Sequence, residues 1–222
     1  MITLIIFFLI LWFLFHKLRL VCESANEADW GGKWLNRLDG FNRLLCYKYH
    51  RLELEPIYLP KTGGAIIACN HISGLDPLLV GAAVKRPLRF MVAREEYNRF
   101  GLRWFFRATK CIPVDRNSRP EIAFREALSH LKAGEVIVVF PHGKLHLPSD
   151  PPRKLKAGAV RLSNLTGSPV FPLHISGIAG MGHVLPAVYK RSHARIRSFS
   201  PMVCEGTDVD ECLEKLAEII NR

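Results

Sequence analysis

Short apolar runs alternate with amphipathic stretches along most of the chain beyond residue 58. The apolar runs predict β-strands at residues 65–69, 88–93, 111–114, 135–140, 170–175 and 195–199. The stretches between and after them predict helices at residues 77–84, 95–108 and 120–132, and a last one capped by Thr207. Strands that alternate with helices favour an α/β fold, in which helices flank a mixed, largely parallel sheet.

The N-terminal residues have a different pattern. Residues 2–15 are almost wholly apolar, and as a helix this run is about 21 Å long, shorter than the ~30 Å hydrocarbon core of a bilayer. Lys17 and Arg19 follow the run instead of preceding it, which argues against a signal peptide and for a protein body on the cytoplasmic side. The run therefore predicts an anchor at the cytoplasmic face of the inner or plasma membrane, either spanning a thinned bilayer or partly embedded in it.

Residues 30–49 form a second segment with a composition that suits a membrane interface. Four large apolar residues recur there at helical spacing, namely Trp34, Leu38, Phe41 and Leu45. Cations are interspersed among them. This pattern fits two interpretations, a helix in the bilayer interface or an amphipathic helix packed on the globular part. We divide the chain into an N-terminal membrane anchor and amphipathic helical segment at residues 1–50 and a globular domain at residues 51–222.

Charge and cysteine usage narrow the possible partners and compartment. The 222 residues carry a formal net charge of +11, which indicates an anionic partner such as nucleic acid, acidic lipid or a phosphorylated substrate. The chain has no arginine-glycine tract or zinc-finger spacing, so nucleic acid is the least favoured of these. The six cysteines lack pair spacing, which predicts free, buried thiols in a reducing compartment.

The segment that ends the strand at residues 65–69 carries the clearest candidate chemistry. Asn70 and His71 follow the strand, and Asp76 and Pro77 then begin a helix. An imidazole titrates near neutrality, and a carboxylate that holds one ring nitrogen leaves the other free to accept a proton. The pair therefore predicts a general base, although Asp76 as a helix cap and His71 as an ordinary loop residue are the simpler alternatives.

Four later segments also have recognisable patterns, and the last of them belongs mainly to the core. Residues 110–116 lead from a strand to Arg116, a residue type that binds phosphate in bidentate fashion. Residues 136–145 form a buried strand that ends in Phe-Pro and a glycine turn, and residues 153–159 and 169–173 follow. His142 and His146 have a spacing that converges on a metal only in a helix, and the glycine between them argues against one, so we predict no metal site.

These segments, in this order, resemble the signature of the glycerolipid acyltransferases, the family that includes 1-acylglycerol-3-phosphate acyltransferase. The string Asn70-His71-x4-Asp76 matches the first motif, and the segment ending at Arg116 matches the second. The third motif, Phe-Pro-Glu-Gly-Thr-Arg in the family, departs from the pattern at three positions: His142 for Glu, Lys144 for Thr and Leu145 for Arg. Residues 153–159 resemble a Phe-Lys-x-Gly-Ala element, and residues 169–173 match the fourth motif.

The resemblance implies a glycerol-3-phosphate acyltransferase-like fold and a membrane enzyme of phospholipid biosynthesis. Such an enzyme transfers a fatty acyl group from acyl-CoA or acyl carrier protein (acyl-ACP) to the hydroxyl of a lysophospholipid, without another cofactor. The implied roles are a general base oriented by a carboxylate for His71 and Asp76, support of the site for Asn70, and acceptor or phosphate binding for Arg116, His142, Gly143, Lys144 and Lys156.

Some alternatives remain open beside this resemblance. The altered third motif leaves the acceptor undecided, and a lipid without a glycerol phosphate, such as a lyso-ornithine lipid, is one candidate. A non-catalytic lipid-binding relative with the same fold is another. Three arginines at four-residue intervals, Arg99, Arg103 and Arg107, form either a solvated face or a docking site for anionic lipid headgroups or an acidic acyl carrier protein.

Overall fold

The computed structural model describes residues 2–116 and 118–221, and within them seven strands form one sheet in the order β1-β7-β6-β2-β5-β3-β4. The strands are β1 (Glu53–Leu54), β2 (Ala65–Cys69), β3 (Leu88–Ala93), β4 (Ile112–Val114), β5 (Val136–Val139), β6 (Val170–Ser176) and β7 (Arg195–Ser198). Neighbouring strands are parallel except β6 and β7, which are antiparallel. The predicted mixed, largely parallel sheet is therefore confirmed.

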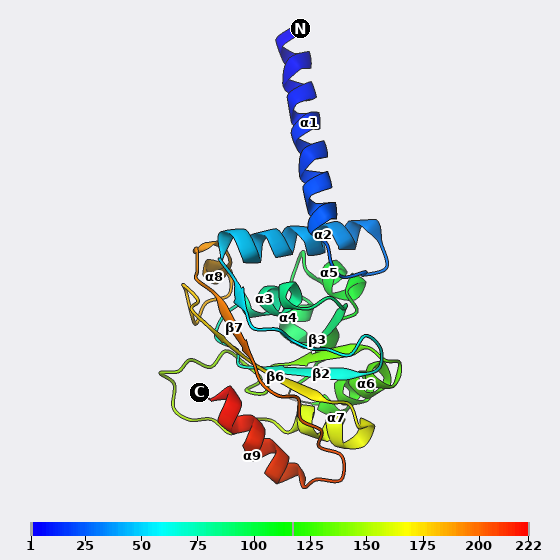
Figure 1. The fold of residues 1–222 in the computed structure, drawn as a ribbon, viewed down its shortest axis with the longest axis vertical. Helices are drawn as coiled ribbons and strands as arrows, with labels where there is room; N and C mark the ends of the chain where they lie inside the picture. Colours follow the sequence, from blue (N-terminus) through cyan, green and yellow to red (C-terminus); the bar gives the residue numbers. More distant parts are fainter. Residues whose placement is uncertain (1, 117, 222) are drawn as a thin grey trace.

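Helices cover both faces of the sheet (Figure 1). On one face lie α2 (Lys33–Leu44), the π-helical turn η1 (Leu45–Tyr49), α3 (Asp76–Ala83) and α8 (Leu185–Tyr189), and on the other lie α6 (Pro120–Lys132), α7 (Gly158–Thr166) and α9 (Val209–Ile220). Each face has its own apolar core. Ile67 and Leu79 belong to the first, and Ile66 and Leu216 to the second. Successive residues of β2 point to opposite faces, so a strand covered on both sides reads as a continuous apolar run.

Helix α1 (Ile2–Ala25) projects away from the body, and α2 lies across its base (Figure 1). The helix continues past residue 15 to Ala25, and at 1.5 Å per residue its 24 residues extend about 36 Å. The predicted length of about 21 Å is therefore too short. Residues Thr3–Ala25 are long and apolar enough to cross a bilayer, with a mean hydropathy of 2.2 in their most apolar window and none of that window buried.

Helix α2 is fixed to the body of the protein through its inner face. The buried Arg43 guanidinium donates hydrogen bonds to the carbonyl oxygens of Ala82, at 2.9 Å, and Val84, and Asn42 donates to the carbonyl of Leu78 at 2.8 Å. Gly40 allows α1 to cross closely, because a Cβ there would lie 1.7 Å from the carbonyl oxygen of Cys22. One face of α2 thus packs as an ordinary amphipathic helix, while its outer face stays exposed.

Two predictions on local structure are wrong. The helix expected at residues 95–108 is broken at Gly101, whose φ of +81° is left-handed, into α4 (Arg94–Tyr97) and α5 (Arg103–Ala108). Arg99 lies between these two helices, so the three arginines do not share one helical face. The last helix is capped by the carboxylate of Asp208, which accepts from the amide of Asp210, and Thr207 precedes the cap.

The cysteine prediction is confirmed only in part. Cys22, Cys46, Cys69 and Cys111 are free and buried, as expected. Cys204 and Cys212 form a disulfide, with their Cα atoms 6.1 Å apart. The reason is tertiary, since α9 packs Cys212 into the same core cluster that holds Cys204. The expectation that all six thiols are free is therefore wrong.

Candidate functional site

The predicted contact between His71 and Asp76 is present at the carboxyl end of β2. His71 Nδ1 lies 2.8 Å from Asp76 Oδ2. The side chain of Asp76 is fully buried, whereas that of His71 keeps 20% of its surface exposed. Because an ionised carboxylate only accepts hydrogen bonds, Nδ1 donates to Asp76 and the lone pair is left on Nε2. This is the arrangement that a general base requires.

The Asp76 carboxylate is held by its own loop and does not cap the helix that it begins. Oδ2 accepts hydrogen bonds from the backbone amides of Ile72, at 2.7 Å, and Ser73, at 2.8 Å. Oδ1 accepts from the hydroxyl of Ser73 at 2.5 Å. These donors precede Asp76 in the chain, and the N-cap of α3 is Leu75. The loop therefore fixes the carboxylate, and the carboxylate in turn fixes the His71 ring.

Aromatic and backbone contacts complete the surroundings of His71. Its ring stacks on Phe140, the residue after β5, with centroids 4.2 Å apart and planes at 20°. Its carbonyl oxygen accepts from the amide of His146 at 2.7 Å. Asn70 bridges to β6, because its side chain donates to the carbonyl of Ile175 at 2.8 Å and accepts from that residue's amide at 2.7 Å. Asn70 thus ties the end of β2 to the neighbouring strand.

His142 of the third motif is buried and holds the C-terminal helix. His142 is only 3% exposed. Its Nε2 lies 3.0 Å from Oδ1 of Asn221 at the end of α9, and its ring stacks on that of His146 with the centroids 4.2 Å apart. Burial lowers the pKa of the His142 imidazole from its ordinary value, and the hydrogen bond to Asn221 opposes that shift only in part. Within the described residues its Nδ1 has no hydrogen-bond partner. A neutral ring that donates to Asn221 from Nε2 leaves Nδ1 as a buried acceptor.

The third motif and the lysine segment after it lie together. Gly143 adopts a φ of +74°, and a Cβ on it would lie 2.9 Å from both Cε and Nζ of Lys156. The amide of Lys156 donates to the carbonyl of Pro141 at 2.9 Å. Lys144 and Lys156 are both exposed. Exposed cations therefore gather beside the loop that contacts His71 through His146.

Arg116 lies at the same edge of the sheet as His71 but on a more distant strand. It follows β4 and is exposed. Strands β5 and β3 separate β2 from β4, so at ~4.8 Å per strand the two strand ends are about 14 Å apart. Arg94 follows β3, which is nearer to β2, and pairs with Asp115 at 3.5 Å. The motifs do not include Arg94. The feature of the sequence that could indicate Arg94 as a site residue is its position directly after the predicted strand at residues 88–93.

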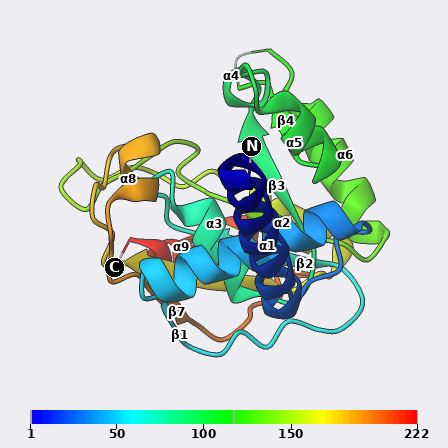
Figure 2. The same cartoon turned by 90° about the horizontal axis from the view of Figure 1, so that it is seen from above.

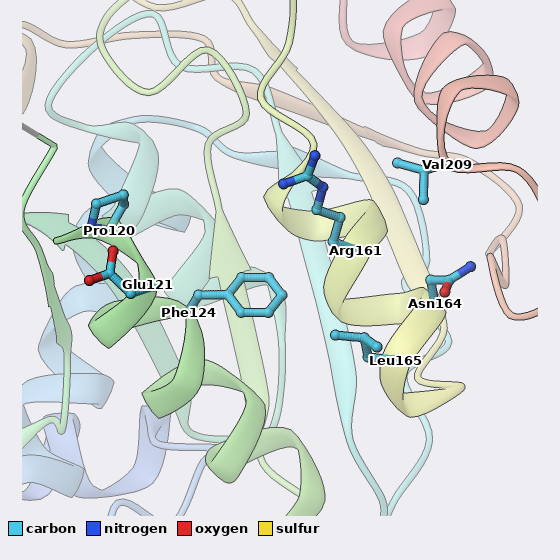
Figure 3. A pocket seen from close by; sticks show the side chains of 7 residues that line it. All are labelled: Pro120, Glu121, Phe124, Arg161, Asn164, Leu165 and Val209. Carbon is cyan, nitrogen blue, oxygen red and sulfur yellow. The ribbon is translucent and has the colours of Figure 1, made fainter.

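A hollow of about 520 Å³ lies elsewhere, between α6 and α7. Figure 3 shows Phe124 of α6 pointing across it towards α7. The lining residues are Pro120, Glu121, Phe124, Arg161, Asn164, Leu165 and Val209. None of the predicted site residues lines it. Within the described part of the chain, no group of three or more His, Cys, Asp or Glu side chains is arranged to hold a metal.

Residues 52–176 match the family model described as Acyltransferase. The match covers more than half of the chain and includes all four motifs. The chain belongs to the acyltransferase family. The predicted family resemblance is thus confirmed.

Two curated proteins are similar to parts of the chain. It is 28% identical over 120 residues to the 1-acyl-sn-glycerol-3-phosphate acyltransferase of Bacillus subtilis (strain 168), covering 54% of this chain and 59% of that protein. It is 32% identical over 135 residues to the N-acylphosphatidylethanolamine synthase of Arabidopsis thaliana, covering 56% and 47%. The chain thus spans about half the length of these relatives.

The fold is that of a known acyltransferase. The crystal structure of the 1-acyl-sn-glycerophosphate (LPA) acyltransferase PlsC from Thermotoga maritima superposes with a TM-score of 0.68 at 22% identity, covering 86% of this chain and 78% of that one. At this identity the similarity concerns the fold. It confirms the predicted glycerol-3-phosphate acyltransferase-like sheet with flanking helices.

In this acyltransferase fold, Gly143 is a position at which a side chain is costly. Replacing Gly143 with alanine is expected to lower the free energy of unfolding by about 1–2 kcal/mol, because an L-residue is strained at positive φ. The new Cβ also displaces Lys156. Chemical denaturation measures the change. Gly158→Ala is the matched control, since nothing lies within 4 Å of its Cβ position, and equal stability of the two variants would contradict the prediction.

Proposed function

We propose that this member of the acyltransferase family transfers a fatty acyl group from acyl-CoA or acyl-ACP to the hydroxyl of a lysophospholipid such as 1-acylglycerol-3-phosphate. The observation that carries the proposal is the imidazole of His71, held at Nδ1 by a buried carboxylate and partly exposed at the carboxyl edge of the sheet. The name of the Bacillus subtilis relative supports the choice of acceptor.

The proposed reaction is a direct transfer between two substrates. Nε2 of His71 takes the proton from the acceptor hydroxyl, and the oxygen forms a bond to the carbonyl carbon of the thioester. The carbon–sulfur bond then breaks, and the leaving thiolate takes the proton from His71. Asp76 stabilises the imidazolium that exists between these two proton transfers. No metal or further cofactor takes part in this scheme.

Exposed cations along the same edge provide the sites for anionic groups. Arg116 is the proposed contact for the acceptor phosphate, and Lys144 and Lys156 lie beside the loop of the third motif. Because the ends of β2 and β4 are about 14 Å apart, His71 and Arg116 stand at separate points of one extended site. Arg94, between them, is a further proposed cation of this site.

The acceptor and the product are lipids, so the enzyme gains from a place at the membrane. We propose that α1 crosses or enters the bilayer and that Lys17 and Arg19 keep the body at the cytoplasmic face of the inner or plasma membrane. The helix has no covering element in the described chain, and its apolar side chains from Leu4 to Phe15 are exposed. A bilayer is the partner that removes this apolar surface from water.

A second candidate acceptor lacks the glycerol phosphate, or carries an amine in place of the hydroxyl. The motif departure at His142 and the similarity to an N-acylphosphatidylethanolamine synthase favour it. A lyso-ornithine lipid and phosphatidylethanolamine are therefore tested beside the lysophospholipids.

The test is an acceptor screen with the purified full-length protein. Radiolabelled acyl-CoA and acyl-ACP are each incubated with 1-acylglycerol-3-phosphate, other lysophospholipids, a lyso-ornithine lipid and phosphatidylethanolamine, and the lipid products are separated. Transfer to a lysophospholipid hydroxyl is the expected result. Transfer only to one of the other two acceptors supports the second candidate, and lipid binding without any transfer overturns the proposed enzyme.

Replacing Arg116 with alanine is expected to raise the KM for a phosphate-bearing acceptor about 10- to 100-fold with a smaller change in kcat. The reason is that a hydrogen bond to a charged group contributes about 1.5–3 kcal/mol, and this one forms with the part of the acceptor that does not react. Arg125→Ala is the matched control, because it removes an exposed arginine from α6. An unchanged KM, or the same change in both variants, would remove Arg116 from the site.

A further inference from the structure

Three segments present exposed apolar side chains around the base of α1. We call them together the collar: Trp34 and Phe41 of α2, Phe100 and Trp104 of the α4–α5 segment, and Leu185 and Tyr189 of α8. Two contacts join these segments, one between α2 and α5 and one between η1 and α8. The rings of Trp34 and Trp104 are 5.0 Å apart, and the hydroxyl of Tyr49 donates to the carbonyl of Tyr189 at 2.6 Å.

The α4–α5 segment is the most exposed part of the collar. Phe100 is fully exposed, and the left-handed turn at Gly101 presents it between the two short helices. Arg99 and Arg103 flank it and are also exposed. Aromatic rings interleaved with cations suit the boundary between lipid headgroups and acyl chains, where the ring leaves water and the cation meets phosphate.

The position of α1 indicates where the bilayer lies. The helix rises from α2, so the membrane that holds α1 begins at the level of α2 (Figure 1). Trp104 contacts Trp34 of α2, which places the α4–α5 segment beside that level. An anionic leaflet also matches the net charge of +11 of the chain. The collar is therefore continuous with the surface that a bilayer already has to cover.

We propose that the α4–α5 segment is a second membrane contact, in which Phe100 and Trp104 enter the headgroup boundary of the leaflet and Arg99 and Arg103 bind anionic lipid. The proposal rests on the proposed membrane association of α1. Figure 2 shows α4 at the head of the β3 arrow, so this contact lies at the carboxyl edge of the sheet. That edge also carries His71 and Arg116, and the contact holds it against the membrane from which a lipid acceptor arrives.

The experiment measures the depth of a fluorescent label in vesicles. Full-length protein is reconstituted in phosphatidylcholine vesicles that contain phosphatidylglycerol, with one introduced cysteine carrying an NBD label. The four native free thiols are buried, so the introduced thiol reacts preferentially. Phe100→Cys reports on the proposed contact, Phe8→Cys on α1, and Leu165→Cys is the matched control, an exposed apolar residue of α7 on the other side of the sheet.

The expected result is quenching at position 100 by nitroxide-labelled lipid, a blue-shifted emission there, and neither effect at position 165. Removing phosphatidylglycerol or replacing Arg103 with glutamine is expected to lower the quenching at position 100. If the label at position 100 shows the emission of a label in water and no quenching, while the label at position 8 is quenched, this inference is overturned and the membrane anchor is retained. A water-like label at 8 overturns the anchor itself, whatever the acyltransferase activity. Shielding at 100 only when acyl carrier protein is added overturns the lipid assignment and gives the surface to that protein.

Discussion

Replacing His71 with alanine is expected to lower kcat for acyl transfer by about 10²- to 10⁴-fold, the usual contribution of a positioned general base. Without the imidazole, the site loses the group that takes the proton from the acceptor hydroxyl as it attacks the thioester. Binding of the acceptor headgroup is expected to change little, because Arg116 lies at a different point of the edge. Steady-state kinetics with the acceptor identified in the screen measures both effects.

The control for this variant has to separate lost chemistry from lost structure. His193→Ala removes an exposed histidine two residues before β7, and it is expected to keep full activity. The thermal midpoint of His71→Ala is compared with that of the parent, because the stack on Phe140 also contributes to packing. A folded His71→Ala protein with more than a tenth of the parent kcat would rule out His71 as the base.

The sequence predicts the central part of the fold well because burial and periodicity agree there. The strand at residues 65–69 is buried on both faces and appears as a continuous apolar run, so its bounds coincide with those of β2. Strand β1 has only two residues, Glu53 and Leu54, and is too short for any pattern. Helix α7 follows a proline-rich stretch and was not predicted, although its buried face includes Ala159 and Leu162.

The site divides in the same way into local and long-range parts. The His71–Asp76 pair spans five residues of one loop, so its spacing alone predicts the contact. The contact between His142 and Asn221 joins residues 79 positions apart, and no local pattern contains it. Stacking of His71 on Phe140 likewise depends on β2 and β5 being neighbours in the sheet. A catalytic pair within one loop can therefore be predicted from the sequence, whereas the contacts that support the pair depend on how the strands and helices are arranged.

Replacing Asp76 with alanine is expected to lower the free energy of unfolding by about 3–5 kcal/mol and to abolish most of the activity. The carboxylate accepts from the amides of Ile72 and Ser73 and from the hydroxyl of Ser73, and each buried donor left without a partner costs about 1–3 kcal/mol. The His71 ring also loses the group that sets its orientation. Chemical denaturation and acyl-transfer assays measure the two losses.

Asp76→Asn separates these two effects. Its amide oxygen can keep the bonds that Oδ2 accepts, and its amide nitrogen can donate to the Ser73 hydroxyl, so most of the stability is retained. The negative charge that stabilises an imidazolium is lost, and kcat is expected to fall about 10- to 100-fold. The pattern of large activity loss with small stability loss therefore assigns the charge of Asp76 to catalysis.

Asp208 offers the matched control for the simpler view that Asp76 only caps a helix. Its carboxylate caps α9, and Asp208→Ala is expected to cost about 1 kcal/mol without affecting turnover. The donors to Asp76 precede it in the chain, so its removal opens the loop that carries His71 and leaves the amides of α3 as they were. If Asp76→Ala cost no more than Asp208→Ala and kept normal turnover, the loop would not depend on this carboxylate. The imidazole would then need another orienting group, and the case for His71 as a base would fail with it.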